Sequence, residues 1–395
     1  MGRRKILVAG AGIGGLTAAA CLARRGFEVE IFEQAPQLGE VGAGIQTSAN
    51  AVKVLYDLGL RDRLEQVAVK PKAYEFRRFD TGELLHYVPL NADDQHERKH
   101  GTPYYHLHRV DIHSILADRV RELAPSALHL DARVTDFQES ENGVDLSLAD
   151  GRTFRGDVLV GADGIKSVIR NKIVGDSQPR YTGQAAWRVT VPVERLPANL
   201  MDRVVTVFCG PKNHAVIYYL RSGKVLNFVG CHERDWEEES WTSRRPWEEL
   251  RSDYAGWHPI VQSVIDAADR NECFRWALNS RPAVSQWSTA HATLLGDAVH
   301  PTLPYMAQGA VMAIEDSAVL ARCLAGTPSV ADALDRYQQA RAERTARIVR
   351  ESTEHGNLFH IVNAEEMRRA FREKDIARSR AEWLYCYDPL KVPLP

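Results

Sequence analysis

The sequence predicts an α/β fold in which a mainly antiparallel sheet is inserted into a parallel sheet, followed by C-terminal helices. Three apolar runs end in glycine-containing turns, at residues 5–15, 157–164 and 292–297, a pattern typical of buried parallel strands. Strand-like stretches dominate between residues 178 and 280, and helical patterns follow residue 309. Because 395 residues exceed one ordinary core, we expect two closely packed domains.

The first 33 residues form a βαβ unit with a glycine-rich turn. Lys5–Ala9 is an apolar strand and residues 16–25 form an alanine-rich helix. Glu28–Phe32 is a second strand, and the acidic residue Glu33 follows it directly. The G-x-G-x-x-G spacing permits a tight turn, approach of a pyrophosphate to the backbone, and close packing of helix on strand. Free N–H groups at the helix start bind phosphates, and the acid accepts hydrogen bonds from ribose hydroxyls. The unit predicts a Rossmann-like dinucleotide site at Gly10, Gly12, Gly14, Gly15 and Glu33.

Composition limits the partners of the chain. A net charge of −2 gives no electrostatic footprint for nucleic acid, and no apolar run is long enough for integral membrane association. The six cysteines contain no C-x-x-C pair, which is typical of reduced thiols in a cytoplasm. We expect a cytoplasmic protein without a metal site, either a monomer or a homodimer.

Other elements follow from periodicity and turn residues. In the first half we expect a helix at 48–58, a hairpin at 74–79 and 84–88, a polar surface excursion at 91–101, an amphipathic helix at Arg109–Leu123, and strands near 128–130, 133–138 and 144–148. In the second half we expect strands at 184–193, 203–209, 214–220, 225–231 and 273–278, a helical segment at 246–268, and helices at 309–325, 330–354 and 364–382.

Two further motifs follow the glycine-rich turn in the chain. The first is Ala162-Asp163-Gly164 after a buried strand, and the second is Gly296-Asp297 with Pro301, followed by Gln308-Gly309-Ala310. In this order, the three motifs resemble those of the single-component FAD-dependent aromatic hydroxylases of the para-hydroxybenzoate hydroxylase type. The resemblance covers nearly the whole chain.

The resemblance implies that FAD is the bound cofactor and that NADH or NADPH binds transiently, because only one G-x-G-x-x-G is present. The Asp297 carboxylate follows a buried strand, where it can bind a ribityl hydroxyl of FAD. Residues 308–310 open a helix, whose positive end suits the pyrimidine edge of the reduced flavin. Arg109 could instead be a solvated residue at a helix start, and Asp163 could belong to a plain turn at the end of a strand; both alternatives remain open. Besides the residues of the βαβ unit, the implied cofactor-binding residues are Arg109, Asp163, Gly164, Gly296, Asp297, Pro301, Gln308, Gly309 and Ala310.

The same resemblance implies a division of the chain. FAD-binding parts are expected at 1–75, 106–177 and 286–355, and substrate-domain parts at 76–105 and 178–285. Residues 356–395 are expected to form a C-terminal helical tail.

Segments at 42–46, 303–309 and 383–388 look most like the salicylate, 3-hydroxybenzoate and 6-hydroxynicotinate hydroxylase branch. The last of these carries histidine where this chain has Gln46 and Tyr305, which favours a benzenoid acid over a pyridine. The resemblance implies Gln46, Tyr305 and Arg188 as substrate-binding residues. Recognition of the carboxylate by Arg188, Arg221 or a histidine stays open.

His214 and Tyr218 resemble a catalytic pair on a strand of that branch. With a strand period of two, they face the same side as Val216. A neutral imidazole can accept the proton of a phenol, which raises the electron density of the ring. A buried histidine beside a packing tyrosine is the alternative interpretation.

The expected function is an FAD- and NAD(P)H-dependent monooxygenase that hydroxylates a small aromatic hydroxyacid of the salicylate or 3-hydroxybenzoate type with molecular oxygen, through a flavin C4a-hydroperoxide. A hydroxypyridine carboxylate such as 6-hydroxynicotinate is the alternative substrate. A non-hydroxylating FAD oxidoreductase and a non-catalytic flavin-binding module are the alternative functions. A halogenase is disfavoured because the W-x-W-x-I motif is absent.

Overall fold

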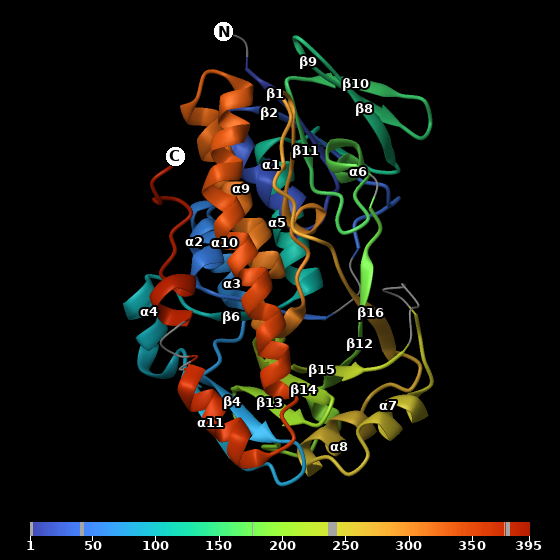
Figure 1. Cartoon of the computed structure of the whole chain (residues 1–395), viewed down its shortest axis with the longest axis vertical. Coiled ribbons are helices and arrows are strands. Elements are labelled where there is room, and N and C mark those ends of the chain that lie inside the picture. The colour runs from blue at the N-terminus through green and yellow to red at the C-terminus, as the bar shows by residue number, and fades with distance from the viewer. Residues whose placement is uncertain (1–2, 40–42, 176, 236–242, 375, 377–379) are drawn as a thin grey trace.

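A computed structural model describes residues 3–39, 43–175, 177–235, 243–374, 376 and 380–395 (Figure 1). Two large sheets lie at opposite ends of an elongated molecule, and the long helix α10 (Val330–Phe359) runs from one toward the other. Their strand orders are β17-β11-β1-β2-β7 and β16-β12-β15-β14-β13-β4-β5. The expected α/β fold is therefore confirmed.

The five-stranded sheet is entirely parallel. Its central strand β1 is a run of aliphatic residues, and such side chains are buried on both faces when helices cover the sheet. Helix α1 (Ile13–Arg24) packs against α5 (Arg109–Leu123) and α9 (Gly309–Gly326). The strands are β1 (Lys5–Ala9), β2 (Glu28–Phe32), β7 (Leu128–His129), β11 (Val158–Gly161) and β17 (Ala292–Leu294).

The seven-stranded sheet is antiparallel except where β4 pairs with β13. Helices α7 (Trp247–Asp253) and α8 (Pro259–Asp266) contribute to an apolar cluster with side chains from one face of this sheet. Because β4 begins at Ala73, the expected domain boundary at residues 75–76 falls inside a strand. The strands are β4 (Ala73–Arg78), β5 (Leu84–Pro89), β12 (Arg180–Pro192), β13 (Val205–Gly210), β14 (Asn213–Leu220), β15 (Val225–Glu233) and β16 (Phe274–Ser280).

Smaller elements complete the fold. Two minor sheets contain β10-β9-β8 and β3-β6. Their strands are β3 (Gly44–Thr47), β6 (Tyr105–His108), β8 (Val134–Ser140), β9 (Gly143–Leu148) and β10 (Thr153–Gly156). The remaining helices and helical turns are α2 (Ala49–Asp57), α3 (Arg61–Val67), α4 (Gln95–His100), α6 (Val168–Val174), α11 (Ala364–Lys374), η1 (Ala92–Asp94), η2 (Val193–Arg195), η3 (Arg221–Gly223), η4 (Gly296–Ala298), η5 (Pro304–Met306) and the π-helical turn η6 (Arg380–Tyr385).

Three local expectations are met in part. The polar excursion at 91–101 contains helix α4, whose His96 and His100 are buried because their rings pack against Tyr385. The segment 246–268 forms two helices, since α7 ends at Asp253 before the start of α8 at Pro259. Of the helix expected at 364–382, α11 covers Ala364–Lys374 and η6 begins at Arg380, while residues 375 and 377–379 lie outside the described residues.

Within the described residues, no helix is long and apolar enough to cross a membrane. The same part of the chain contains no cluster of three or more metal-binding side chains.

Candidate active site

Three adjoining hollows follow the carboxyl ends of the parallel strands, where ligands of such sheets bind. The first is lined by Gly12 and Glu33, and the second shares Gly12 and adds Gly164. The third hollow shares Arg109 and Asp297 with the second and reaches the seven-stranded sheet. Together the hollows form an extended path, which fits a dinucleotide better than a mononucleotide.

The glycine-rich turn leaves space where a pyrophosphate would lie. A Cβ on Gly12 would meet no atom within 4 Å, whereas a Cβ on Gly15 would overlap the carbonyl oxygen of Gly10. Gly10 itself has a φ of +97°, and a Cβ there would lie 2.6 Å from the Ala162 carbonyl oxygen. The Glu33 carboxylate accepts hydrogen bonds from the amides of Ala11 (2.8 Å) and Ala35 (2.9 Å).

The Gly296-Asp297 turn is held by a buried ion network. Asp316 of α9 accepts hydrogen bonds from the Gly296 amide (3.2 Å) and from His300 Nε2 (2.6 Å), and it pairs with Arg341 (2.7 Å). His300 therefore orients this turn. Gly14 of the glycine-rich turn packs against the residue before Gly296, since a Cβ on Gly14 would lie 2.9 Å from a methyl carbon of Leu295.

Asp297 lines all the hollows that meet at this turn. Asp297 is an exposed residue, yet the desolvation of its carboxyl group raises the pKa of that group against the opposing effects of His300 and Arg109. Among the described residues, no side chain or amide donates a hydrogen bond to this carboxylate. Its oxygens are thus available to hydroxyl groups of a ligand in the path.

Other expected cofactor residues differ in their placement. Gly309 and Ala310 line the second and third hollows at the start of α9, and Pro301 lines a neighbouring hollow. The Gln308 side chain is buried and donates to Ser48 Oγ (3.1 Å). Asp163 Oδ2 accepts a hydrogen bond from the Val168 amide (2.8 Å), so this carboxylate caps the start of α6, and its role toward a cofactor stays a prediction.

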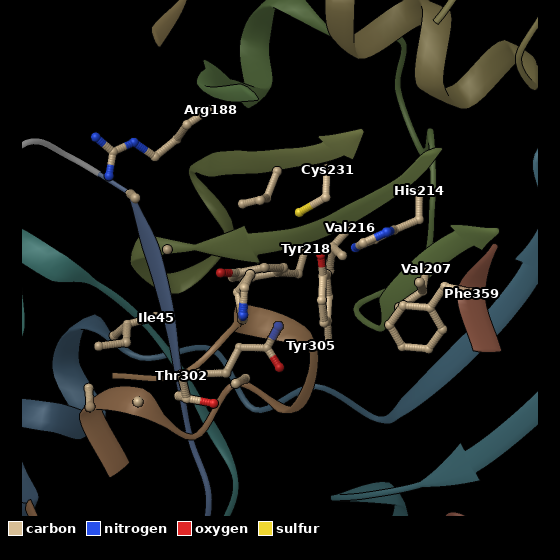
Figure 2. A pocket seen from close by; sticks show the side chains of 18 of the residues that line it. Ile45, Arg188, Val207, His214, Val216, Tyr218, Cys231, Thr302, Tyr305 and Phe359 are labelled. Atoms are coloured by element: carbon tan, nitrogen blue, oxygen red, sulfur yellow. The ribbon is translucent and has the colours of Figure 1, made fainter. Parts of the chain in front are cut away.

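The third hollow is a cavity of about 250 Å³ between β14, β3, η5 and the end of α10. His214, Val216 and Tyr218 project into it from one face of β14 (Figure 2), which confirms the predicted alternation. Ala215 and Ile217 pack in the apolar cluster on the opposite face.

His214 is almost fully buried in this wall. Its ring packs edge-on against Tyr305 and Phe359, with ring centroids 5.2 Å apart in both pairs. Nδ1 lies 3.0 Å from Nε2 of His360. Burial and the nearby His360 lower the pKa of His214 well below its ordinary value, so its imidazole is neutral at pH 7.

The three expected substrate-binding residues all line the cavity. Gln46 Oε1 accepts hydrogen bonds from the hydroxyls of Tyr104 (2.8 Å) and Tyr74. The Tyr305 hydroxyl bonds to Gln184, so this tyrosine presents its ring to the cavity. Arg188 stacks on Trp276 at 4.7 Å and lies apart from the His214 group in Figure 2.

Comparisons with known proteins agree with this site. A family model described as an FAD binding domain matches residues 3–352. A 3-amino-4-hydroxybenzoate 2-monooxygenase of Streptomyces platensis is 37% identical over 99% of this chain and 98% of its own length. The chain belongs to the FAD-dependent aromatic hydroxylases.

Two further relatives support the family. A 3-hydroxybenzoate 6-hydroxylase of Polaromonas naphthalenivorans is 36% identical over 96% of this chain and 95% of its own length. The crystal structure of Klebsiella pneumoniae HpxO, in complex with FAD and uric acid, has a TM-score of 0.84 and 26% identity, and 96% of each chain is covered. The enzyme is thus an FAD-dependent monooxygenase with NAD(P)H as reductant, and the open turn at Gly12 and the available Asp297 carboxylate fit FAD.

Sequence reasoning missed several residues of the hydroxylase cavity. Tyr74 and Phe76 come from β4, Trp276 from β16, Phe359 from the end of α10, and Arg380 from η6. Tyr74 and Phe76 are two residues apart in β4, so the alternation of strand side chains could have predicted that they share one face. No local pattern points to Arg380, because it reaches the cavity from more than 300 residues beyond Gln46.

Proposed function

We propose that this hydroxylase acts on a benzenoid hydroxyacid, with His214 as the general base that accepts the phenol proton. The observation that carries the proposal is the shared position of His214 and Tyr218 on the cavity face of β14, beside the FAD path. FAD, reduced by NAD(P)H, supplies activated oxygen, and the chain supplies binding, orientation and proton acceptance.

The cavity supports a small aromatic substrate. Aliphatic and aromatic side chains form most of its walls, including Val207, Val216 and Phe76. Such walls exclude water, which protects reactive oxygen species from release before they react with the ring. The neutral His214 imidazole has the protonation state that a general base needs.

A benzenoid acid is favoured over a pyridine. Gln46 and Tyr305 occupy the positions at which the hydroxynicotinate branch carries histidine, and both line the cavity. Relatives named for 3-amino-4-hydroxybenzoate and 3-hydroxybenzoate are 37% and 36% identical to this chain, and a 6-hydroxynicotinate 3-monooxygenase of Pseudomonas fluorescens is 34% identical.

The test is a screen of salicylate, 3-hydroxybenzoate, 3-amino-4-hydroxybenzoate and 6-hydroxynicotinate for stimulated NAD(P)H oxidation. We expect a hydroxybenzoate to give the strongest stimulation and a product that carries one atom from labelled oxygen gas. Benzoate serves as the control, because it lacks the hydroxyl and should yield hydrogen peroxide instead of product. Preference for 6-hydroxynicotinate would overturn the benzenoid assignment.

We further propose the remaining placements. Glu33, Arg109, Gly296, Asp297, Gly309 and Ala310 would hold FAD, which is supported by their positions along the three hollows. The inserted seven-stranded sheet would form the substrate domain. A cytoplasmic location is supported by the six cysteines, which are all free thiols.

A further inference from the structure

We infer that Arg380 is the residue that binds the carboxylate of the aromatic substrate. This inference rests on the proposed function, because it names the anchor for the acid group in the same cavity. Arg380 lines that cavity, and only 3% of its surface is exposed. Its Nε atom is buried and has no hydrogen-bond partner among the described residues.

Among the described residues, no carboxylate is recorded as a partner of Arg380. The guanidinium lies over the ring of Tyr74, with Cζ 5.5 Å from the ring centroid, and its ionisable neighbours include Tyr104, Tyr385 and the neutral His355. Burial raises the pKa of all three tyrosines, so they are neutral at pH 7. No ion pair joins Arg380 to a carboxylate within the described part of the chain.

Two other deeply buried arginines are paired with carboxylates, whereas buried Arg170 donates to three backbone carbonyl oxygens. Arg341 bonds to Glu315 and Asp316, and Arg275 bonds to Glu249. A buried guanidinium without an anion is unfavourable, because desolvation is not compensated. A ligand carboxylate in the cavity would provide the missing charge, and the planar fork of arginine suits it.

The C-terminal part of η6 is held by contacts with α10 and α4. Arg344 of α10 donates to the carbonyl oxygens of Trp383 and Leu384, both at 3.1 Å. The Tyr385 ring packs against His96 of α4, with centroids 5.1 Å apart. These contacts fix η6 against the cavity, so that the guanidinium is positioned before a ligand arrives.

The other cavity arginines are less suited to this role. Arg109 also lines the second hollow and acts electrostatically on Asp297, which places it with FAD. Arg188 stacks on Trp276 and lies away from the His214 group. Arg380 instead adjoins Tyr74, whose hydroxyl bonds to Gln46, and all three residues line the cavity.

The experiment compares an acid with its neutral amide in the FAD-loaded enzyme. Dissociation constants of 3-hydroxybenzoate, salicylate and the corresponding hydroxybenzamides are measured from the change in the flavin absorption spectrum. In Arg380→Met we expect the affinity for the acid to fall on the order of 10- to 100-fold, while affinity for the amide changes little. Arg380→Lys should lose part of the preference for the acid.

Two controls separate recognition from structural damage. Arg369→Gln removes an exposed arginine of α11 and should leave both affinities unchanged. Arg188→Gln tests the competing arginine. General damage in Arg380→Met would weaken acid and amide equally, and Arg380→Lys decides the matter if the methionine variant does not fold.

The outcomes distinguish this inference from the proposed function. The role of Arg380 is overturned if Arg380→Met still prefers the acid over the amide. It is also overturned if Arg188→Gln loses this preference instead. Both results leave the hydroxylase assignment intact. A wild-type enzyme that neither binds nor hydroxylates these acids and amides overturns the proposed substrate class itself.

Discussion

His214 Nδ1 lies 3.0 Å from His360 Nε2, and His360 Nδ1 lies 3.3 Å from the Glu233 carboxylate. His214 is buried at the cavity wall, His360 is partly buried, and Glu233 is exposed. When His214 Nε2 faces the substrate, each imidazole donates its single N–H toward Glu233. The three side chains then form a path along which a proton from the cavity can reach solvent.

The first prediction concerns the general base. His214→Asn keeps a polar side chain but cannot accept the phenol proton at pH 7, so hydroxylation should fall by about 10²–10⁴-fold. FAD content should stay normal, because His214 lines the cavity and not the first two hollows. Product yield per NAD(P)H and melting temperature are measured on the same sample, with Tyr218→Phe as a milder variant. Normal turnover with a lowered melting temperature would assign His214 to core packing.

The second prediction concerns His360. Its proximity contributes to the lowered pKa of His214, so His360→Gln should let that pKa rise toward the ordinary value, although burial still holds it below. The acidic limb of the rate–pH profile should therefore move to higher pH, since His214 becomes protonated earlier as the pH falls. Hydroxylation rates are measured from pH 5 to 8, with Glu233→Gln for comparison. Superimposable profiles of wild type and His360→Gln would exclude this coupling.

Much of the fold was predictable because burial imposes simple patterns. The apolar runs of β1 and β11 and the turn at Gly10 are local signals, and the alternation at His214 and Tyr218 predicted a common face. Most of residues 91–101 lie at the surface, as their polarity predicts, but His96 and His100 of this segment are buried. His96 and His100 stay neutral and pack as aromatic rings, a role that depends on partners distant in the sequence.

The candidate site was predictable only where its residues lie in motifs. Asp297 follows a buried strand and faces the path, as its place in the sequence indicates. Gln308 belongs to the same motif, yet its side chain packs inward against Ser48. Arg380 reaches the cavity, and His360 reaches His214, from C-terminal elements whose docking is determined by tertiary contacts, so no spacing in the sequence reveals them.

The third prediction concerns stability in acid. Burial lowers the pKa of both His106 and His355 to about 3, while the unfolded chain has the ordinary value near 6.5. Between these values the unfolded state binds more protons, so the free energy of unfolding should fall as the pH decreases from 6.5 toward 3. Each histidine contributes up to roughly 1.4 kcal/mol per pH unit. Urea unfolding at several pH values measures the slope, and His106→Gln should reduce it; equal slopes would contradict the prediction.

The last prediction contrasts two glycines of one motif. A Cβ on Gly12 meets no protein atom and its φ of −70° suits alanine, so Gly12→Ala should fold with nearly unchanged stability of the FAD-free protein. The added methyl group occupies the space that a pyrophosphate needs, and FAD affinity should fall by at least tenfold. A Cβ on Gly15 would overlap the Gly10 carbonyl oxygen, so Gly15→Ala should instead destabilise the fold itself. Melting temperatures of the FAD-free variants and titration with FAD separate the two effects. Equal FAD affinity in Gly12→Ala and wild type would place the pyrophosphate away from this turn, because only a ligand makes Gly12 necessary there.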